Sequence, residues 1–301
     1  MKIKLIILLV AGLMIPLSAS WAQNGPKTRE EVIKLVTGLK YQQGEINLHG
    51  GLARLTVPKE FNYLGPDDAE TVLVKLWGNP PASQKTLGLL MPANVTPLSS
   101  NCWVVTIEYV EDGYVKDQDA GKINYDDLLK QMQKATVESN KRRSAKGYPT
   151  VELVGWAATP RYDADTHKLY WAKRLKFEGE TGDTLNYDIR MLGRHGVLVL
   201  SAVSSLDQLD QIQKETPQIL GMVDFKEGNR YSDFDPKVDK VATYGIAALV
   251  AGGIAAKFGF FKLIWVFLLA AKKFVIIAFV ALAAWFRKIF GKHEGSSGPT
   301  A

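Results

Sequence analysis

The chain has a single cysteine, Cys102, among its 301 residues. A domain that is exported and has no second cysteine folds without an intramolecular disulfide, so its stability must come from a hydrophobic core. A lone thiol next to Trp103 is more typical of a small buried apolar side chain than of a reactive nucleophile.

The segment 23–240 also lacks the short motifs of several common enzyme classes. It has no glycine-rich phosphate-binding loop, no His-x-x-x-His zinc motif and no Gly-x-Ser-x-Gly nucleophile elbow. The sequence therefore offers no ready catalytic set, and we assign no catalytic, cofactor-binding or metal-binding residue from it.

Basic residues exceed acidic ones and give a formal net charge of +6, but the excess is not evenly spread. It lies at the two ends of the chain, whereas basic and acidic residues nearly balance within 23–240. A nucleic-acid-binding protein needs basic residues clustered on its folded domain. The charge distribution therefore argues against a nucleic-acid partner.

The N-terminal residues 1–22 have the pattern of a secretory signal peptide. Lys2 and Lys4 precede an apolar run, and Ser20 and Ala22 form a small-x-small cleavage site. We expect cleavage after Ala22. The alternative is an uncleaved membrane anchor, which would export the following domain equally well.

The C-terminal part of the chain is strongly apolar and predicts a transmembrane helix over 241–261. At a rise of about 1.5 Å per residue, this segment can cross a hydrocarbon core of about 30 Å. Lys257 lies about one turn from its end, where the side chain can reach the headgroups. Ala248, Gly252 and Ala256 recur every fourth residue and would admit a second helix, although a helix facing lipid explains them equally well.

The segment 262–292 is apolar too, but Lys272 and Lys273 interrupt it. In a second span these lysines would lie near the middle of the bilayer, at about 2.5 to 3.5 kcal/mol each. The run 274–286 is too short to cross by itself, so we favour an interfacial helix with basic ends over a second span. Residues 293–301 are expected to form a flexible tail.

The exported segment 23–240 mixes helical and strand patterns. Helices are predicted after the capping residues Thr28 and Asn124 and from Pro66. A further helix is expected to be bent or ended by Pro217. Gly50-Gly51 predicts a two-residue hairpin turn between strands over 45–49 and 52–57.

From residue 151 the pattern alternates with period two for some fifty residues, which predicts an antiparallel meander. Over 185–191, apolar side chains alternate with Asn186, Asp188 and Arg190, and this implies one buried face and one wetter face. The fold class expected is therefore α+β, with a mainly antiparallel sheet and interspersed helices.

Histidines and acidic clusters are the remaining chemical candidates. His167 follows Asp163 and Asp165, and His195 follows Arg190 and Arg194, so either could serve as a general acid or base. Surface histidines in hairpin turns are the commoner explanation.

Two groups of acids invite a cation-binding interpretation, although the spacing of the first does not match a calcium loop. The second group could also meet lipid headgroups, but a solvated linker is the simpler explanation. An aromatic recognition face is also conceivable, although Trp171 belongs to the apolar side of its strand. The three groups are Asp112, Asp117, Asp119, Asp126 and Asp127; Asp233, Asp235 and Asp239; and Tyr148, Trp156, Tyr162, Tyr170, Trp171 and Phe177.

A set of short motifs spans nearly the whole mature chain. They are Gly65-Pro-Asp-Asp-Ala-Glu70, Trp77-Gly-Asn79, Gly113-Tyr-Val115, Lys122-Ile-Asn-Tyr-Asp126, Gly155-Trp156, Leu192-Gly-Arg194 and Tyr231-Ser-Asp-Phe-Asp-Pro236. Together they resemble a bacterial family of uncharacterised membrane-anchored proteins, domain of unknown function family 2167. The resemblance implies the architecture and an envelope location, and it supplies no catalytic residue.

These observations favour a membrane-anchored envelope protein that binds a partner, with a membrane-tethered periplasmic hydrolase as the alternative. The expected partners are the inner-membrane bilayer, an envelope protein and a second helix in the membrane. Basic residues follow the first predicted span, so the positive-inside bias places the tail in the cytoplasm and the domain in the periplasm. A helical hairpin that returns the tail to the periplasm is the alternative.

Overall fold

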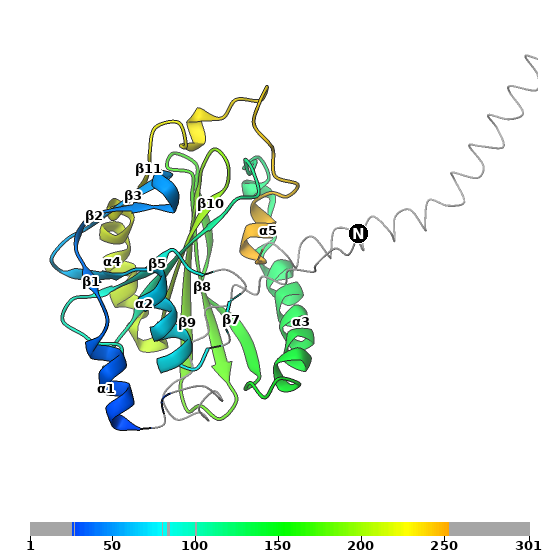
Figure 1. Cartoon of the computed structure of the whole chain (residues 1–301). Coiled ribbons are helices and arrows are strands. Elements are labelled where there is room, and N and C mark those ends of the chain that lie inside the picture. Colours follow the sequence, from blue (N-terminus) through cyan, green and yellow to red (C-terminus); the bar gives the residue numbers. More distant parts are fainter. Residues whose placement is uncertain (1–25, 27, 80, 83–84, 100, 253–301) are drawn as a thin grey trace, which may run out of the picture. The chain divides into compact units, whose positions relative to one another are not determined.

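An eight-stranded antiparallel sheet organises the protein, with strand order β1-β4-β5-β6-β10-β9-β8-β7 (Figure 1). The computed structural model describes residues 26, 28–79, 81–82, 85–99 and 101–252. The predicted signal peptide and all of 253–301 lie outside these residues. The strands are β1 (Tyr41–Gln42), β4 (Phe61–Leu64), β5 (Gly88–Pro92), β6 (Val104–Val110), β7 (Val151–Asp163), β8 (Lys168–Phe177), β9 (Asp183–Leu192) and β10 (Val197–Ser205).

A second, three-stranded sheet has the order β11-β3-β2. Its strands are β2 (Gly44–Leu48), β3 (Ala53–Val57) and β11 (Val223–Phe225). The α-helices of the described residues are α1 (Arg29–Thr37), α2 (Pro66–Glu70), α3 (Tyr125–Ser144), α4 (Leu209–Met222) and α5 (Ile246–Val250), and a π-helical turn, Thr71–Leu76, continues α2. The predicted α+β class with a mainly antiparallel sheet is confirmed for the described part of the chain.

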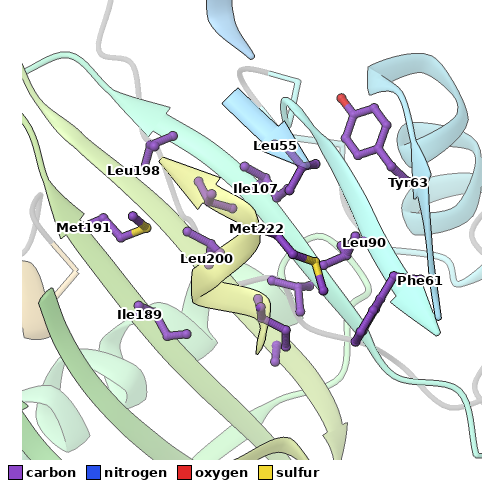
Figure 2. Close-up of a cluster of buried hydrophobic side chains, with 14 of the residues drawn as sticks. Leu55, Phe61, Tyr63, Leu90, Ile107, Ile189, Met191, Leu198, Leu200 and Met222 are labelled. Carbon is purple, nitrogen blue, oxygen red and sulfur yellow. The ribbon is translucent and has the colours of Figure 1, made fainter. Parts of the chain in front are cut away.

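The three-stranded sheet and α4 pack on one face of the large sheet, where they enclose the largest apolar cluster. Figure 2 shows side chains from both sheets and from α4 pointing toward one another. The labelled side chains are all buried: Leu55, Phe61, Tyr63, Leu90, Ile107, Ile189, Met191, Leu198, Leu200 and Met222. With one cysteine in the chain, this burial is the main source of stability.

The opposite face of the large sheet is covered in two parts. Side chains of α1 and α2 pack with β4, β5 and β6, while α3 and α5 pack with strands at the β7 side. In α5, Ile246 and Leu249 contact a cluster that includes Leu169, Trp171 and Val199. Both faces of the sheet are therefore buried.

This arrangement corrects the expectation of a wetter face on β9. Asn186, Asp188 and Arg190 are only 3%, 2% and 7% exposed. In the register of the sheet, Trp171 lies opposite Asp188, which lies opposite Ser201. The period-two pattern identified the two faces correctly, but polar residues on the second face are enclosed rather than solvated.

The enclosed carboxylate of Asp188 is compensated on both oxygens. Lys173 Nζ lies 2.8 Å from Oδ2, Arg190 Nη2 lies 3.2 Å from Oδ1, and Ser201 Oγ donates to Oδ1 at 2.6 Å. The Arg190 guanidinium also lies over the Trp171 ring, 4.8 Å from its centroid. Burial alone would raise the pKa of Asp188, but the two cations outweigh it and hold this pKa below its usual value of 3.8.

Local signals gave most of the element boundaries, but not all of them. The capping box at Thr28 and the cap at Asn124 begin α1 and α3 as predicted. The turn at Gly50-Gly51 is longer than two residues, because Leu48 pairs with Ala53 across a short 3₁₀ turn. Strands β1 and β4 were not predicted.

Helix α4 continues through Pro217, so of the two predicted effects, a bend or an end, the end does not occur. Pro217 and Gln213, one turn before it, are both exposed, so water can bond the backbone carbonyl that proline leaves without a donor. The proline is therefore tolerated.

The segment 241–252 differs from the predicted continuous span. Val241 pairs with Tyr114, and a helix begins only at Ile246, where Gly245 has an extended backbone. Ala248, assigned to the small-residue stripe, is buried in the domain. No helix within the described residues has the length and apolar character needed to cross a membrane.

We predict that Asp188→Ala lowers the free energy of unfolding by about 3–5 kcal/mol, since it leaves Lys173 and Arg190 enclosed without their carboxylate. The matched control is Glu138→Ala, whose exposed pair with Lys141 should contribute about 0.5 kcal/mol or less. Denaturant titration of the full chain measures both values. Equal losses in the two variants would contradict the buried network.

The same network predicts a pH dependence. Because the pKa of Asp188 is lowered by folding, its contribution is complete above the unfolded value near 3.8 and disappears as the pH falls through the folded value. The stability difference between the wild type and Asp188→Ala should therefore shrink below about pH 4. A difference that grows on acidification would contradict the assigned sign.

Candidate functional site

Four loops meet at one end of the large sheet, and we call them together the loop end: residues 111–119, 163–167, 193–196 and 228–246. They follow β6, β7, β9 and β11, and they lie at the upper end of the sheet in Figure 1. The pairing of Val110 with Val197 and of Lys168 with Met191 brings their starting points together. Both candidate histidines belong to this end.

Arg194 and Asp239 form the ion pair that holds the last of these loops. Arg194 Nε lies 2.7 Å from Asp239 Oδ2, and Asp239 has a side chain that is only 4% exposed. The same oxygen accepts the backbone N–H of Asp235 at 2.6 Å, and Arg194 Nη1 donates to the Gly228 carbonyl. The hydrogen bond from Arg194 holds the pKa of Asp239 below its usual range.

Residues 239–246, which we call the exit strap, continue the chain from this ion pair toward the C-terminal apolar segment. The strap pairs in parallel with Tyr114: Tyr114 N donates to the Lys240 carbonyl and Ala242 N to the Tyr114 carbonyl, each at 2.8 Å. Two carboxylates then hold its far half. Tyr244 Oη donates to Asp112 at 2.7 Å and Ile246 N to Asp119 at 3.1 Å.

Two glycines permit the strap to lie this close. Gly113 has φ of +102°, and a Cβ built on it would lie 2.5 Å from the Lys240 carbonyl oxygen. A Cβ on Gly245 would lie 2.5 Å from Asp119 Oδ2. A larger residue at Gly113 would push the strap away from the domain, and one at Gly245 would displace the Asp119 carboxylate.

The acidic residues considered as cation ligands have a structural use in this arrangement. Asp112, Asp117 and Asp119 accept hydrogen bonds from Tyr244, Tyr162 and the Ile246 backbone. Within the part of the chain that the structure describes, no group of three or more acidic, histidine or cysteine side chains could hold a metal ion.

His167 belongs to a three-residue array that the sequence did not predict. Tyr162 Oη donates to Asp117 Oδ2 at 2.7 Å, and His167 Nδ1 lies 3.2 Å from Tyr162 Oη and 3.7 Å from Asp117 Oδ2. Because the tyrosine proton is directed to Asp117, Nδ1 is the donor to Tyr162. Burial and the bond to Asp117 raise the pKa of Tyr162. Asp163, which lies near His167 in the sequence, instead accepts hydrogen bonds from Asp165 N and Thr166 N within its own turn.

His167 also has an unusual backbone, with φ of +51°, and its ring packs on Tyr231 with centroids 4.1 Å apart. Tyr231 stacks in turn on Tyr114 at 4.4 Å, and Tyr114 stacks on Phe234 at 3.9 Å. The residues of this aromatic stack differ from those considered as a recognition face in the sequence. Of that set, Trp171 is buried in the core, as its place on the apolar side of its strand indicated, and Tyr162 joins the array.

His195 has a separate carboxylate partner. Its Nδ1 lies 3.7 Å from Asp239 Oδ1, and its backbone carbonyl accepts a hydrogen bond from Gly113 N at 3.0 Å. Arg194 shares Asp239 with it, whereas Arg190 faces Asp188 in the sheet. Each histidine thus has its own aspartate, and the sequence paired neither correctly.

The loop end explains several of the motifs that carried the family resemblance. Gly113-Tyr-Val115, Leu192-Gly-Arg194 and Tyr231-Ser-Asp-Phe-Asp-Pro236 are far apart in sequence and meet here. Their glycines, aromatic residues and charges hold the exit strap. These three motifs could have located the site from the sequence, although their positions along the chain do not show which residues are in contact.

The chain belongs to the family described as protein of unknown function (DUF2167), whose model matches residues 40–283. The resemblance seen in the motifs is thereby confirmed. No curated protein is significantly similar to the chain.

Two solved structures illustrate how loose the similarity is outside the family. Cyanobacterial PsbP (CyanoP) from Synechocystis is 8% identical, with 62% of this chain and 92% of that chain covered and a TM-score of 0.34. The Ran-binding protein Mog1p of Saccharomyces cerevisiae is 9% identical, with 66% and 100% covered and a TM-score of 0.31. These scores support no inference about function.

We predict that Gly113→Ala destabilises the domain by about 1–3 kcal/mol more than Gly147→Ala does, because only at Gly113 would the new methyl group overlap the strap. Both glycines have positive φ, +102° and +75°, and nothing lies within 4 Å of a Cβ at Gly147. The control therefore carries the backbone cost of about 1 kcal/mol without the steric overlap. Thermal unfolding and limited proteolysis within 239–246 measure the effect, and equal behaviour of the two variants would contradict it.

Proposed function

We propose that the protein is a membrane-anchored protein of the bacterial envelope whose α+β domain lies in the periplasm and binds a partner there. The observation that carries this proposal is the exit strap. Residues immediately ahead of the apolar C-terminal segment are bonded to the domain through Asp239, Tyr114, Asp112 and Asp119. The chain is therefore bonded to the domain as far as Ile246, shortly before the apolar C-terminal segment continues.

The sequence pattern at both ends supports the location. Residues 1–22 have the pattern of an export signal, and lysines and arginines accumulate after residue 261. With 241–252 used by the domain, the anchor is assigned to the apolar residues that follow. A single crossing leaves the tail in the cytoplasm, and the alternative is a helical hairpin.

Partner binding is favoured over catalysis by the way the aspartates beside the histidines are used. Asp239 Oδ2 is bonded to Arg194 and to Asp235 N, and Asp117 Oδ2 accepts the proton of Tyr162. These carboxylates fix loops. Their contacts account for the charged surroundings of both histidines without a reaction.

One observation favours the alternative, a membrane-tethered hydrolase. His167 is held in a left-handed backbone conformation, which is costly for a residue other than glycine and is common at active sites. Its Nδ1 donates toward Tyr162 and Asp117, so a neutral ring would keep the lone pair on Nε2 and could act as a base. In this reading His167 is the catalytic residue.

The topology can be measured with a reporter that is active only in the periplasm. Fused after Ala301 it should be inactive, and inserted in the exposed hairpin turn 179–182 between β8 and β9 it should be active. A cytoplasmic reporter at the same two sites is the control and should give the opposite pattern. Periplasmic activity after Ala301 would contradict the single crossing.

The two activity classes are separated by His167→Asn, since asparagine tolerates the left-handed backbone at this position. Partner binding predicts that this variant still complements a strain lacking the gene, as does the matched variant His195→Asn. The melting temperature of each purified protein serves as the folding control. Loss of complementation in His167→Asn alone, with the fold intact, would favour the hydrolase.

A further inference from the structure

The short turn 236–240, just before the exit strap, has an unusual outer surface. Pro236, Lys237, Val238 and Lys240 are exposed. Val238 is 74% exposed, more than any other large apolar side chain in the described part of the chain. An apolar side chain between two lysines is a pattern that suits a phospholipid surface.

The acids of the same segment are half-buried and accept hydrogen bonds within the domain. Asp233 Oδ2 accepts the Arg230 N–H, Asp235 Oδ1 accepts the Lys237 N–H, and Asp239 is enclosed against Arg194. The hydrogen bond to Asp239 and the negative charges of all three carboxylates raise the pKa of Arg194. The exposed charged side chains of the turn 236–240 are its two lysines, and neither forms an ion pair within the residues described.

Hydrogen bonds within the turn hold its two ends together. Val238 N and Asp239 N both donate to the Asp235 carbonyl, at 3.2 and 2.9 Å, and Asp235 N donates back to Asp239 Oδ2 at 2.6 Å. Val238 is thus held outward before any contact forms. A surface that is already ordered binds without the entropic cost of ordering it.

We propose that this turn rests on the phospholipid headgroup layer, with Val238 inserted between headgroups and Lys237 and Lys240 against lipid phosphates. The inference rests on the membrane anchoring proposed above. It adds that the loop end faces the bilayer, so the opposite end of the sheet, with the β8–β9 turn, faces away from it. Charge and position support the assignment, because the chain continues from Lys240 through the strap to the apolar segment.

The test uses the full chain reconstituted in vesicles of phosphatidylethanolamine and phosphatidylglycerol. A polarity-sensitive fluorophore is attached to Val238→Cys and, as the matched control, to Val137→Cys, which is 62% exposed on α3. Figure 1 shows α3 running away from the loop end. The native Cys102 can stay, because burial raises the pKa of its thiol to about 12 and leaves it almost entirely protonated.

Lipids with a nitroxide on the headgroup should quench the probe at position 238 several-fold more than the probe at position 137. Equal quenching at the two positions would overturn the proposal, as would a probe at 238 that is shielded from water but not quenched by the lipid. The second result would indicate a protein partner on this turn instead.

Lysine replacement tests the electrostatic half of the inference. Lys237→Glu with Lys240→Glu should reduce quenching at position 238, and Lys130→Glu with Lys134→Glu on α3 should not. An unchanged signal in the first pair would remove the role of the lysines.

Resistance of the wild-type chain to alkaline extraction from the vesicles is measured in parallel. If the chain is extracted, both the anchoring and the docking fail. If it resists extraction while quenching at 238 and 137 is equal, the docking alone fails.

Discussion

The constraint on which the structure depends is a broad sheet that is buried on both faces without a disulfide. One face is closed mainly by apolar side chains, whereas the other also encloses the carboxylate of Asp188. An unpaired charge there would strongly lower the free energy of unfolding, so Lys173, Arg190 and Ser201 all contact the Asp188 carboxylate. Their positions on three neighbouring strands fix the register of β8, β9 and β10, and that register in turn fixes where the connecting loops emerge.

The loop end follows from this register, because its loops begin where those strands stop. The exit strap then lies on the domain by close approach at Gly113 and Gly245, by hydrogen bonds to carboxylates, and by packing of Ala242, Tyr244 and Ile246 on an apolar cluster. The hydrogen bonds among these contacts depend on direction and support one another, so displacing one weakens the others. Arg194 is central to them, since it joins the turn after β9 to Asp239 at the start of the strap.

Much of the fold could be predicted because its signals are local: a threonine cap at α1, an asparagine cap at α3 and alternation along the meander. Strand β4 could not be predicted, because a run of four residues is too short to show a pattern and becomes a strand by pairing with β1 and β5. The helix through Pro217 depends on whether a neighbouring carbonyl is solvated, and this is a property of the packed helix. For the site, both histidines were identified, but their partners Asp117 and Asp239 lie 50 and 44 residues away in sequence. No periodicity reports such contacts.

The same limit applies to charge. Counted along the chain, 233–240 has three acids and two lysines. In the structure each of the three carboxylates accepts a hydrogen bond from a backbone N–H or from Arg194, whereas Lys237 and Lys240 are exposed. Net charge is a property of composition, whereas the field at a surface depends on which side chains are turned toward solvent. The loop end can therefore be acid-rich in sequence and still present cations to the surroundings.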